Sequence, residues 1–134
     1  MDYFSIYSYS RKDDMGIHLG GSTIEFKEDK VILEDGYEYD DEDGDRILDG
    51  EDYYYIFRKD IEKLVPLIPY YYSNESILSE YENAKEYYKK LSSYNDKKIF
   101  IFVLNCFKEG PKFDVLLKIL EFHGIYYEHE EMRY

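Results

Sequence analysis

The sequence predicts an α+β fold, with a mainly antiparallel sheet of about five to six strands and two to three helices packed on one face. Three observations lead to this prediction. Short stretches rich in aromatic and β-branched residues fill the first half of the chain, helical spacing of apolar residues appears in the second half, and no linker divides the 134 residues. We therefore expect a single domain over residues 1–134.

The first half of the chain carries strand patterns. Residues 2–9 alternate between two sets of side chains with a period of two, which is typical of a strand. Two β-rich runs at 22–26 and 30–34 flank the polar residues 27–29, which predicts a hairpin. Residues 53–57, YYYIF, predict a further strand.

The middle of the chain carries helix signals. Asp60 can cap a short helix, and Pro66 and Pro69 end it because proline lacks the amide that the next turn needs. Residues 75–92 place apolar side chains at alternating spacings of four and three, along one narrow face. This segment is the longest helix that the sequence predicts.

The C-terminal third supplies the expected core. The almost continuously apolar run 98–107 is typical of a strand buried on both faces, and we expect it to be the central strand. Pro111 opens a helix that Gly124 closes in the left-handed conformation. Residues 125–129 predict a last strand. The residues expected to be buried together are Ile99, Ile101, Val103, Phe113, Leu116, Leu117 and Leu120.

An acidic stretch at about 34–52 dominates the charge of the chain. Eleven of its nineteen residues are Asp or Glu and Arg46 is its only base, so it carries a formal charge of −10 out of −13 for the whole protein. Like charges at this density repel one another, and Gly36, Gly44 and Gly50 provide hinges. We expect an exposed, mobile acidic loop.

Charge and hydropathy limit the partners and the location. Net negative charge disfavours direct nucleic-acid binding, because each phosphate contact needs a Lys or Arg, and it favours a basic protein. The first fourteen residues lack the apolar core of a secretory signal, and no apolar run approaches the ~20 residues of a membrane span. We expect a cytoplasmic protein that does not bind membranes.

The sequence contains no motif for catalysis, metal or cofactor binding. The acidic stretch fits no EF-hand register around Gly44 or Gly50, and His18, His123 and His129 form no ligand cluster. Glycine-rich phosphate loops and nucleophile motifs are absent. We therefore expect no cofactor, no metal and no enzyme, although thirty acidic residues leave an unrecognised carboxylate site as an alternative.

The acidic stretch and the tyrosines beside it are the predicted partner-binding residues. Carboxylates accelerate association with a basic partner, whereas aromatic anchors slow dissociation. The candidate carboxylates are Glu38, Asp40, Asp41, Glu42, Asp43 and Asp45. The candidate anchors are Tyr37, Tyr39, Tyr53, Tyr54 and Tyr55.

A small acidic chain with 18 Tyr, an acid run at 34–52 and no catalytic motif resembles the immunity proteins of bacterial toxin systems, such as contact-dependent growth inhibition. This resemblance implies a cognate toxin domain, commonly a nuclease, that is neutralised by tight one-to-one binding. Substrate mimicry by the acidic stretch would serve equally in an inhibitor of restriction or CRISPR nucleases, which is the main alternative. A structural domain whose acidic residues only aid solubility is a further one.

Overall fold

The computed structural model describes residues 3–71 and 73–133. Strands fill most of the N-terminal half and helices most of the C-terminal half. Five strands, four α-helices and two 3-10 helices (η) follow one another in the described residues: β1 (Tyr3–Asp13), β2 (Gly16–Phe26), β3 (Lys30–Asp41), β4 (Arg46–Phe57), α1 (Arg58–Leu64), η1 (Val65–Tyr70), η2 (Glu75–Ser79), α2 (Ala84–Lys90), α3 (Tyr94–Glu109), α4 (Asp114–Phe122) and β5 (Glu128–Arg133).

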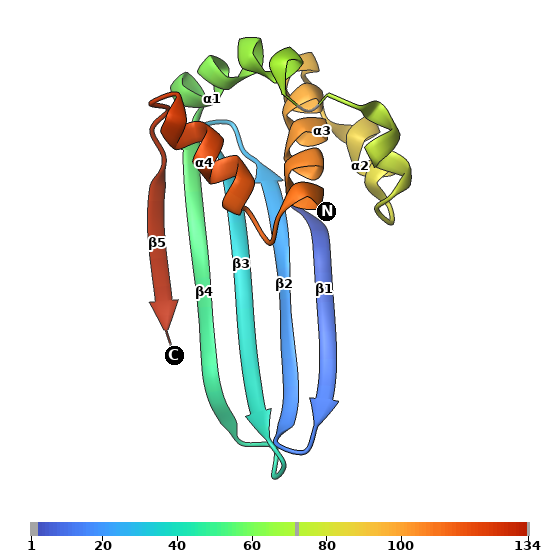
Figure 1. Ribbon diagram of the computed structural model, residues 1–134, viewed down its shortest axis with the longest axis vertical. Coiled ribbons are helices and arrows are strands. Elements are labelled where there is room, and N and C mark those ends of the chain that lie inside the picture. The colour runs from blue at the N-terminus through green and yellow to red at the C-terminus, as the bar shows by residue number, and fades with distance from the viewer. Residues whose placement is uncertain (1–2, 72, 134) are drawn as a thin grey trace.

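The strands form one antiparallel sheet in the order β1-β2-β3-β4-β5. The first four are joined by tight turns, and β5 returns after the helices to pair with β4 along the edge of the sheet (Figure 1). The predicted α+β class is confirmed.

The helices lie at one end of the sheet, against one of its faces (Figure 1). On that face Phe4, Ile24, Leu33 and Ile56 are at most 4% exposed and form the sheet side of the core. Because side chains alternate along a strand, the residues between them point to the opposite face, which none of the described helices covers. The strands also continue well beyond the helical layer (Figure 1).

The prediction of a loop at 34–52 is wrong. These residues form the distal halves of β3 and β4, which pair from Lys30 and Phe57 outward and are joined by the turn 42–45. Alternation sends the carboxylates to two faces instead of one, and Arg46 lies among three of them, so the repulsion is lower than the sequence suggests. Gly36 pairs with Gly21 inside the ladder and is not a hinge.

The prediction of a central strand at 98–107 is also wrong, because this run lies within helix α3. A short apolar run fits a helix buried on most sides as well as a buried strand. Helix α3 packs against α4, η1 and η2, and the ring of Phe100 meets that of Phe4 at 5.1 Å. Ser93 caps the helix by accepting a hydrogen bond from the backbone N–H of Asp96 at 2.9 Å.

The segment 75–92 is not one long helix. It contains η2 and α2, separated by a turn in which Asn83 adopts the left-handed conformation with φ of 66°. A residue with positive φ cannot continue an α-helix, so the apolar spacing spans two short elements. At the start of η2 the side chain of Asn74 accepts a hydrogen bond from the N–H of Ser76.

The remaining elements lie close to their predicted positions. Helix α1 stops before Pro66 as expected, but Asp60 lies in its first turn, buried, and does not cap it. Helix α4 begins at Asp114, three residues after Pro111. Gly124 follows α4 with φ of 67°, as predicted, and β5 starts at Glu128 instead of Ile125.

Six of the seven predicted core residues are buried, and Leu117 is only half-buried at the edge of the cluster. The buried residues of α4 are Leu116, Ile119 and Leu120. No helix within the described ranges is long and apolar enough to cross a membrane.

Candidate functional site

The strand geometry divides the predicted partner-binding residues among three places. Glu38, Asp40, Tyr53 and Tyr55 point to the side away from the helices, which we call the open face. Tyr37, Tyr39, Asp41 and Tyr54 point to the helical side. Glu42, Asp43 and Asp45 are exposed in the turn between β3 and β4, which we call the tip.

Asp41 orders the tip. Its carboxylate accepts hydrogen bonds from the backbone N–H groups of Asp43 at 3.0 Å and Asp45 at 2.9 Å. Gly44 has φ of 86°, a conformation that favours glycine. The tip is therefore a structured turn that holds the carboxylates of Glu42, Asp43 and Asp45 in solvent.

Arg46 gathers the distal carboxylates of the open face. Its guanidinium lies 3.1 Å from Glu38, 2.6 Å from Asp40 and 2.8 Å from Asp49. These contacts raise the pKa of Arg46, the hydrogen bond to Asp40 being the largest cause. One cation shared by three carboxylates leaves this part of the face negative but ordered.

Tyr37 and Tyr39 contact His18 on the helical side of the sheet, beyond the helices. The rings of His18 and Tyr39 lie 4.6 Å apart, and the hydroxyl of Tyr37 lies 3.1 Å from Nδ1 of His18. Tyr39 also donates a hydrogen bond to the carbonyl of Met15 at 2.7 Å, and Nε2 of His18 lies 3.0 Å from Asp13. Both tyrosines thus help to fix the β1–β2 turn.

Tyr54 is half-buried and packs against the core. Its ring stacks on His129 at 4.7 Å and meets Phe113 edge-on at 6.4 Å. Burial raises the pKa of Tyr54 to about 12. Of the three adjacent tyrosines, Tyr53 and Tyr55 therefore remain candidate anchors and Tyr54 does not.

Tyr53 and Tyr55 form a stacked pair on the open face, with ring centroids 6.1 Å apart. Each hydroxyl is fixed by a carboxylate: Tyr53 donates to Glu51 at 2.6 Å, and Tyr55 donates to Glu130 at 3.0 Å. Across the strands the pair faces Glu34 and Ile32 on β3. Aromatic side chains held in this way offer contact area at low entropic cost.

Charge accumulates around this pair. Burial raises the pKa of Glu34 above its ordinary value, and the nearby carboxylates of Glu51 and Asp35 raise it further, while a hydrogen bond with Tyr53 acts in the opposite direction. The charged side chains that alternation places on the open face are Glu25, Glu34, Glu38, Asp40, Asp49, Glu51, Glu128 and Glu130 against Lys12, Lys30 and Arg46. The open face is acidic along its whole length.

A second group of carboxylates lies on the helical side and bears on the enzyme alternative. Asp35 is 6% exposed and accepts a hydrogen bond from the hydroxyl of Ser22. Its cross-strand neighbour Asp52 lies 3.0 Å from Nε2 of His129. Burial raises the pKa of Asp35. Asp35 and Asp52 therefore each already have a polar partner, Ser22 and His129. Ser22 was not predicted, because nothing near it in the chain indicates a carboxylate partner.

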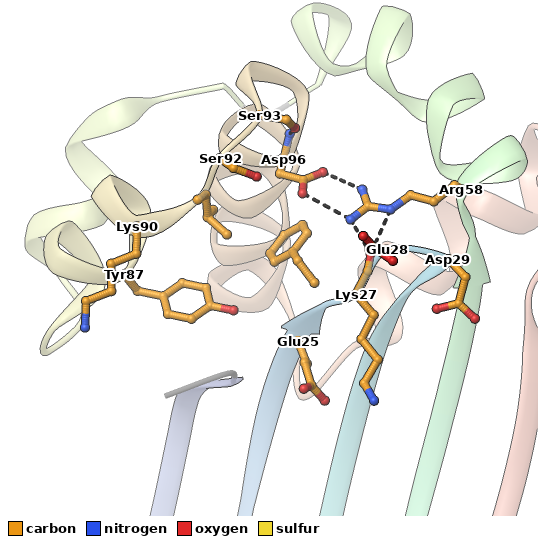
Figure 2. Close-up of a pocket in the computed structure, with 12 residues that line it drawn as sticks. Glu25, Lys27, Glu28, Asp29, Arg58, Tyr87, Lys90, Ser92, Ser93 and Asp96 are labelled. Carbon is orange, nitrogen blue, oxygen red and sulfur yellow. Dashed lines mark hydrogen bonds and ion pairs between the residues drawn. The ribbon is translucent and has the colours of Figure 1, made fainter.

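A cavity of about 780 Å³ lies between the β2–β3 turn and the start of α3 (Figure 2). Arg58 crosses it and donates to both carboxylate oxygens of Asp96, at 2.5 and 3.1 Å, and to the carbonyl of Lys27. The guanidinium therefore connects three segments of the chain. This arrangement is a structural junction whose basic group is already paired.

The thiol of Cys106 is buried in the core. Burial raises the pKa of the Cys106 thiol to about 12, so the reactive thiolate is disfavoured. No group of three or more metal-ligating side chains occurs among residues 3–71 and 73–133.

Comparison with protein-family models, with curated proteins and with solved structures finds no match to this chain. A function must therefore be argued from charge and geometry. The open face brings carboxylates together with the Tyr53–Tyr55 pair, and the tip adds the exposed carboxylates of Glu42, Asp43 and Asp45.

Proposed function

We propose that this protein is a non-catalytic inhibitor that binds a basic protein one to one, through the open face and the tip. The observation that carries the proposal is the open face itself. It joins the ordered Tyr53–Tyr55 pair to a long row of carboxylates, and none of the described helices covers it.

The charge distribution favours a basic partner. The protein has a formal charge of −13, and most of it lies on β3, β4 and the tip between them. A surface with this field attracts a cationic protein from a distance and raises the association rate about 10- to 1,000-fold at low salt. The turn between β3 and β4 lies at the end of the sheet opposite the helices (Figure 1).

The Tyr53–Tyr55 pair supplies the desolvated contacts that slow dissociation. Long-range attraction changes association more than dissociation, so a stable complex also needs desolvated contacts. Tyrosines are frequent at the centre of protein interfaces because they combine apolar area with a polar end. Tyr53 and Tyr55 are ordered by Glu51 and Glu130 before any partner arrives, which lowers the entropic cost of binding.

A toxin domain is the partner that fits best. The active site of a nuclease carries Lys and Arg to hold phosphates, and a row of carboxylates on a rigid hairpin is complementary to it. Inhibition of a toxin is the role of the immunity proteins that this chain resembles in size, acid run and tyrosine content. Such proteins act in the cytoplasm by blocking the toxin and need no catalytic residues of their own.

The proposal is tested by isolating complexes of the tagged chain from its native host. We expect a basic protein in one-to-one stoichiometry whose activity this chain blocks, with an association rate that falls steeply as salt rises. A neutral or acidic partner, or an association rate that does not depend on salt, would contradict the proposal. A restriction or CRISPR nuclease as the partner would support the nucleic-acid mimic instead of the toxin inhibitor.

A further inference from the structure

The open face contains a groove of about 400 Å³ between its first and fourth strands. Tyr3 from β1 stands on one side and the Tyr53–Tyr55 pair from β4 on the other. Between them lie Ile32 and Glu34 of β3. The groove thus combines three phenol rings with two carboxylates, those of Glu25 and Glu34.

The acids of this groove lack a cation of their own. Glu25 lies beside Glu34, and in the part of the chain that the structure describes neither carboxylate forms an ion pair. Burial and the charge of Glu51 raise the pKa of Glu34, which means that its charged form is disfavoured in the free protein. A cation placed in the groove would remove this penalty.

One ring of the groove, that of Tyr55, and the neighbouring ring of Phe57 already contact a cation. The ammonium of Lys30 lies 5.0 Å from the ring centroid of Tyr55 and 5.9 Å from that of Phe57. Both distances lie within the range of cation–π attraction. Lys30 precedes Ile32 on the same side of β3, so it lies next to the groove and does not line it.

We propose that this groove receives an arginine side chain of the basic partner, with the guanidinium against Glu34 and between the tyrosine rings. This inference rests on the proposed function and names the group that the open face recognises. Arginine fits better than lysine because its planar guanidinium stacks on aromatic rings, pairs with a carboxylate through two N–H groups and is more weakly hydrated. The groove is then the anchor of the complex. The tip, and Arg46 with its three carboxylates, lie at the edge of the interface.

The inference is tested first without the partner. The protein is titrated with N-acetyl-arginine methylamide while NMR follows its tyrosine ring protons. We expect saturable shifts at Tyr3, Tyr53 and Tyr55, and none with the citrulline analogue, which has the same shape and no charge. Shifts that are equal for the arginine and citrulline probes, or that centre on tyrosines elsewhere, would overturn the inference. The lysine analogue of the probe is titrated in the same way. If it binds more tightly than the arginine probe, the groove is a site for an ammonium group, and the inference is equally overturned.

Variants sharpen the assignment. Glu34→Gln should weaken arginine binding about fivefold, as expected for one partly exposed charge contact. Glu82→Gln, the same change at an exposed position before α2, should not alter it. Equal weakening by the two variants would show a nonspecific charge effect and exclude the groove.

The same variants separate this inference from the proposed function. If a basic partner binds this chain with a steep salt dependence, and Glu34→Gln leaves its dissociation rate unchanged, the groove is not the anchor although the function holds. If the arginine probe binds the groove and no basic partner exists, the function fails although the site holds.

Discussion

The rings of Tyr53 and Tyr55 are nearly parallel, with 3° between their planes, and both stand on the face of the sheet that the helices leave open. Two residues apart on one strand, they share a side because side chains alternate along β4. The intervening Tyr54 is drawn into the core by Phe113 and His129. One run of three tyrosines therefore supplies both a core contact and two side chains of the open face.

Removing charge from the tip should slow association with the partner. In the triple variant Glu42→Gln, Asp43→Asn and Asp45→Asn, the side chains keep their size but lose three charges that make no ion pair in the described structure. We expect a lower association rate and a weaker salt dependence, with little change in dissociation. Surface-binding kinetics at two salt concentrations measure both rates. Unchanged association at low salt would remove the tip from the binding surface.

Asp41 should act on the tip through structure and not through charge. Asp41→Ala removes the acceptor of two backbone N–H groups, and we expect a loss of about 1 to 2 kcal/mol in unfolding free energy and faster hydrogen exchange at Asp43 and Asp45. Asp41→Asn keeps an acceptor oxygen and should retain most of the stability. Urea unfolding and exchange measurements compare the two. Equal losses for both variants would mean that the negative charge matters, not the hydrogen bonds.

The junction between Arg58 and Asp96 should contribute strongly to stability. Asp96→Asn weakens both contacts to the guanidinium at a site where Asp96 is 6% exposed, and we expect a loss of about 2 to 4 kcal/mol in unfolding free energy. The same change at exposed Asp29, which lies 4.0 Å from Lys30, should cost less than about 0.5 kcal/mol. Denaturant unfolding of the two variants measures the difference. A loss at Asp96 as small as that at Asp29 would show that the ion pair across the cavity does not hold the three segments together.

Asp35 should make the protein less stable as pH rises. Its pKa in the folded state is raised above the ordinary value of 3.8. Between 3.8 and the raised folded-state pKa, the folded state therefore binds more protons than the unfolded state. Stability then falls as pH increases through that window. Asp35→Asn can still accept the hydrogen bond from Ser22 and removes the buried charge. Relative to the parent, the variant should therefore gain unfolding free energy as pH rises from about 4 toward neutrality.

That gain is measured by urea unfolding across the pH range. Because the other acids are common to both proteins, the difference between variant and parent isolates Asp35. A difference that is constant with pH would show that Asp35 titrates alike in the folded and unfolded states.

Local patterns in the sequence predicted the sheet better than the helices. The alternation at 2–9, seen in β1 over its described residues, the runs at 22–26 and 30–34 and the YYYIF stretch all lie in strands, because a period of two is specific to extended chain. The apolar run of α3 was ambiguous, since its burial on most sides hides the helical period. Ser93, three residues before Asp96, was the available sign of a helix start.

The candidate site was predicted in part. Charge density alone suggested a loop, because the sequence does not show that β pairing separates the carboxylates onto two sides or that Arg46 sits among three of them. Tyr53 and Tyr55 were found from their position beside the acids. Tyr3 and Glu25 were missed, because they reach the groove only through strand pairing with distant residues.

If the protein acts as proposed, the basic partner covers the open face. Chemical nitration of tyrosines, mapped by mass spectrometry in the free protein and in the isolated complex, tests this. We predict that the partner protects Tyr3, Tyr53 and Tyr55, while Tyr70 and Tyr94, which are 84% and 72% exposed on the helical layer, react equally in both states. Protection of Tyr70 or Tyr94, with Tyr53 and Tyr55 as reactive in the complex as in the free protein, would contradict the claim.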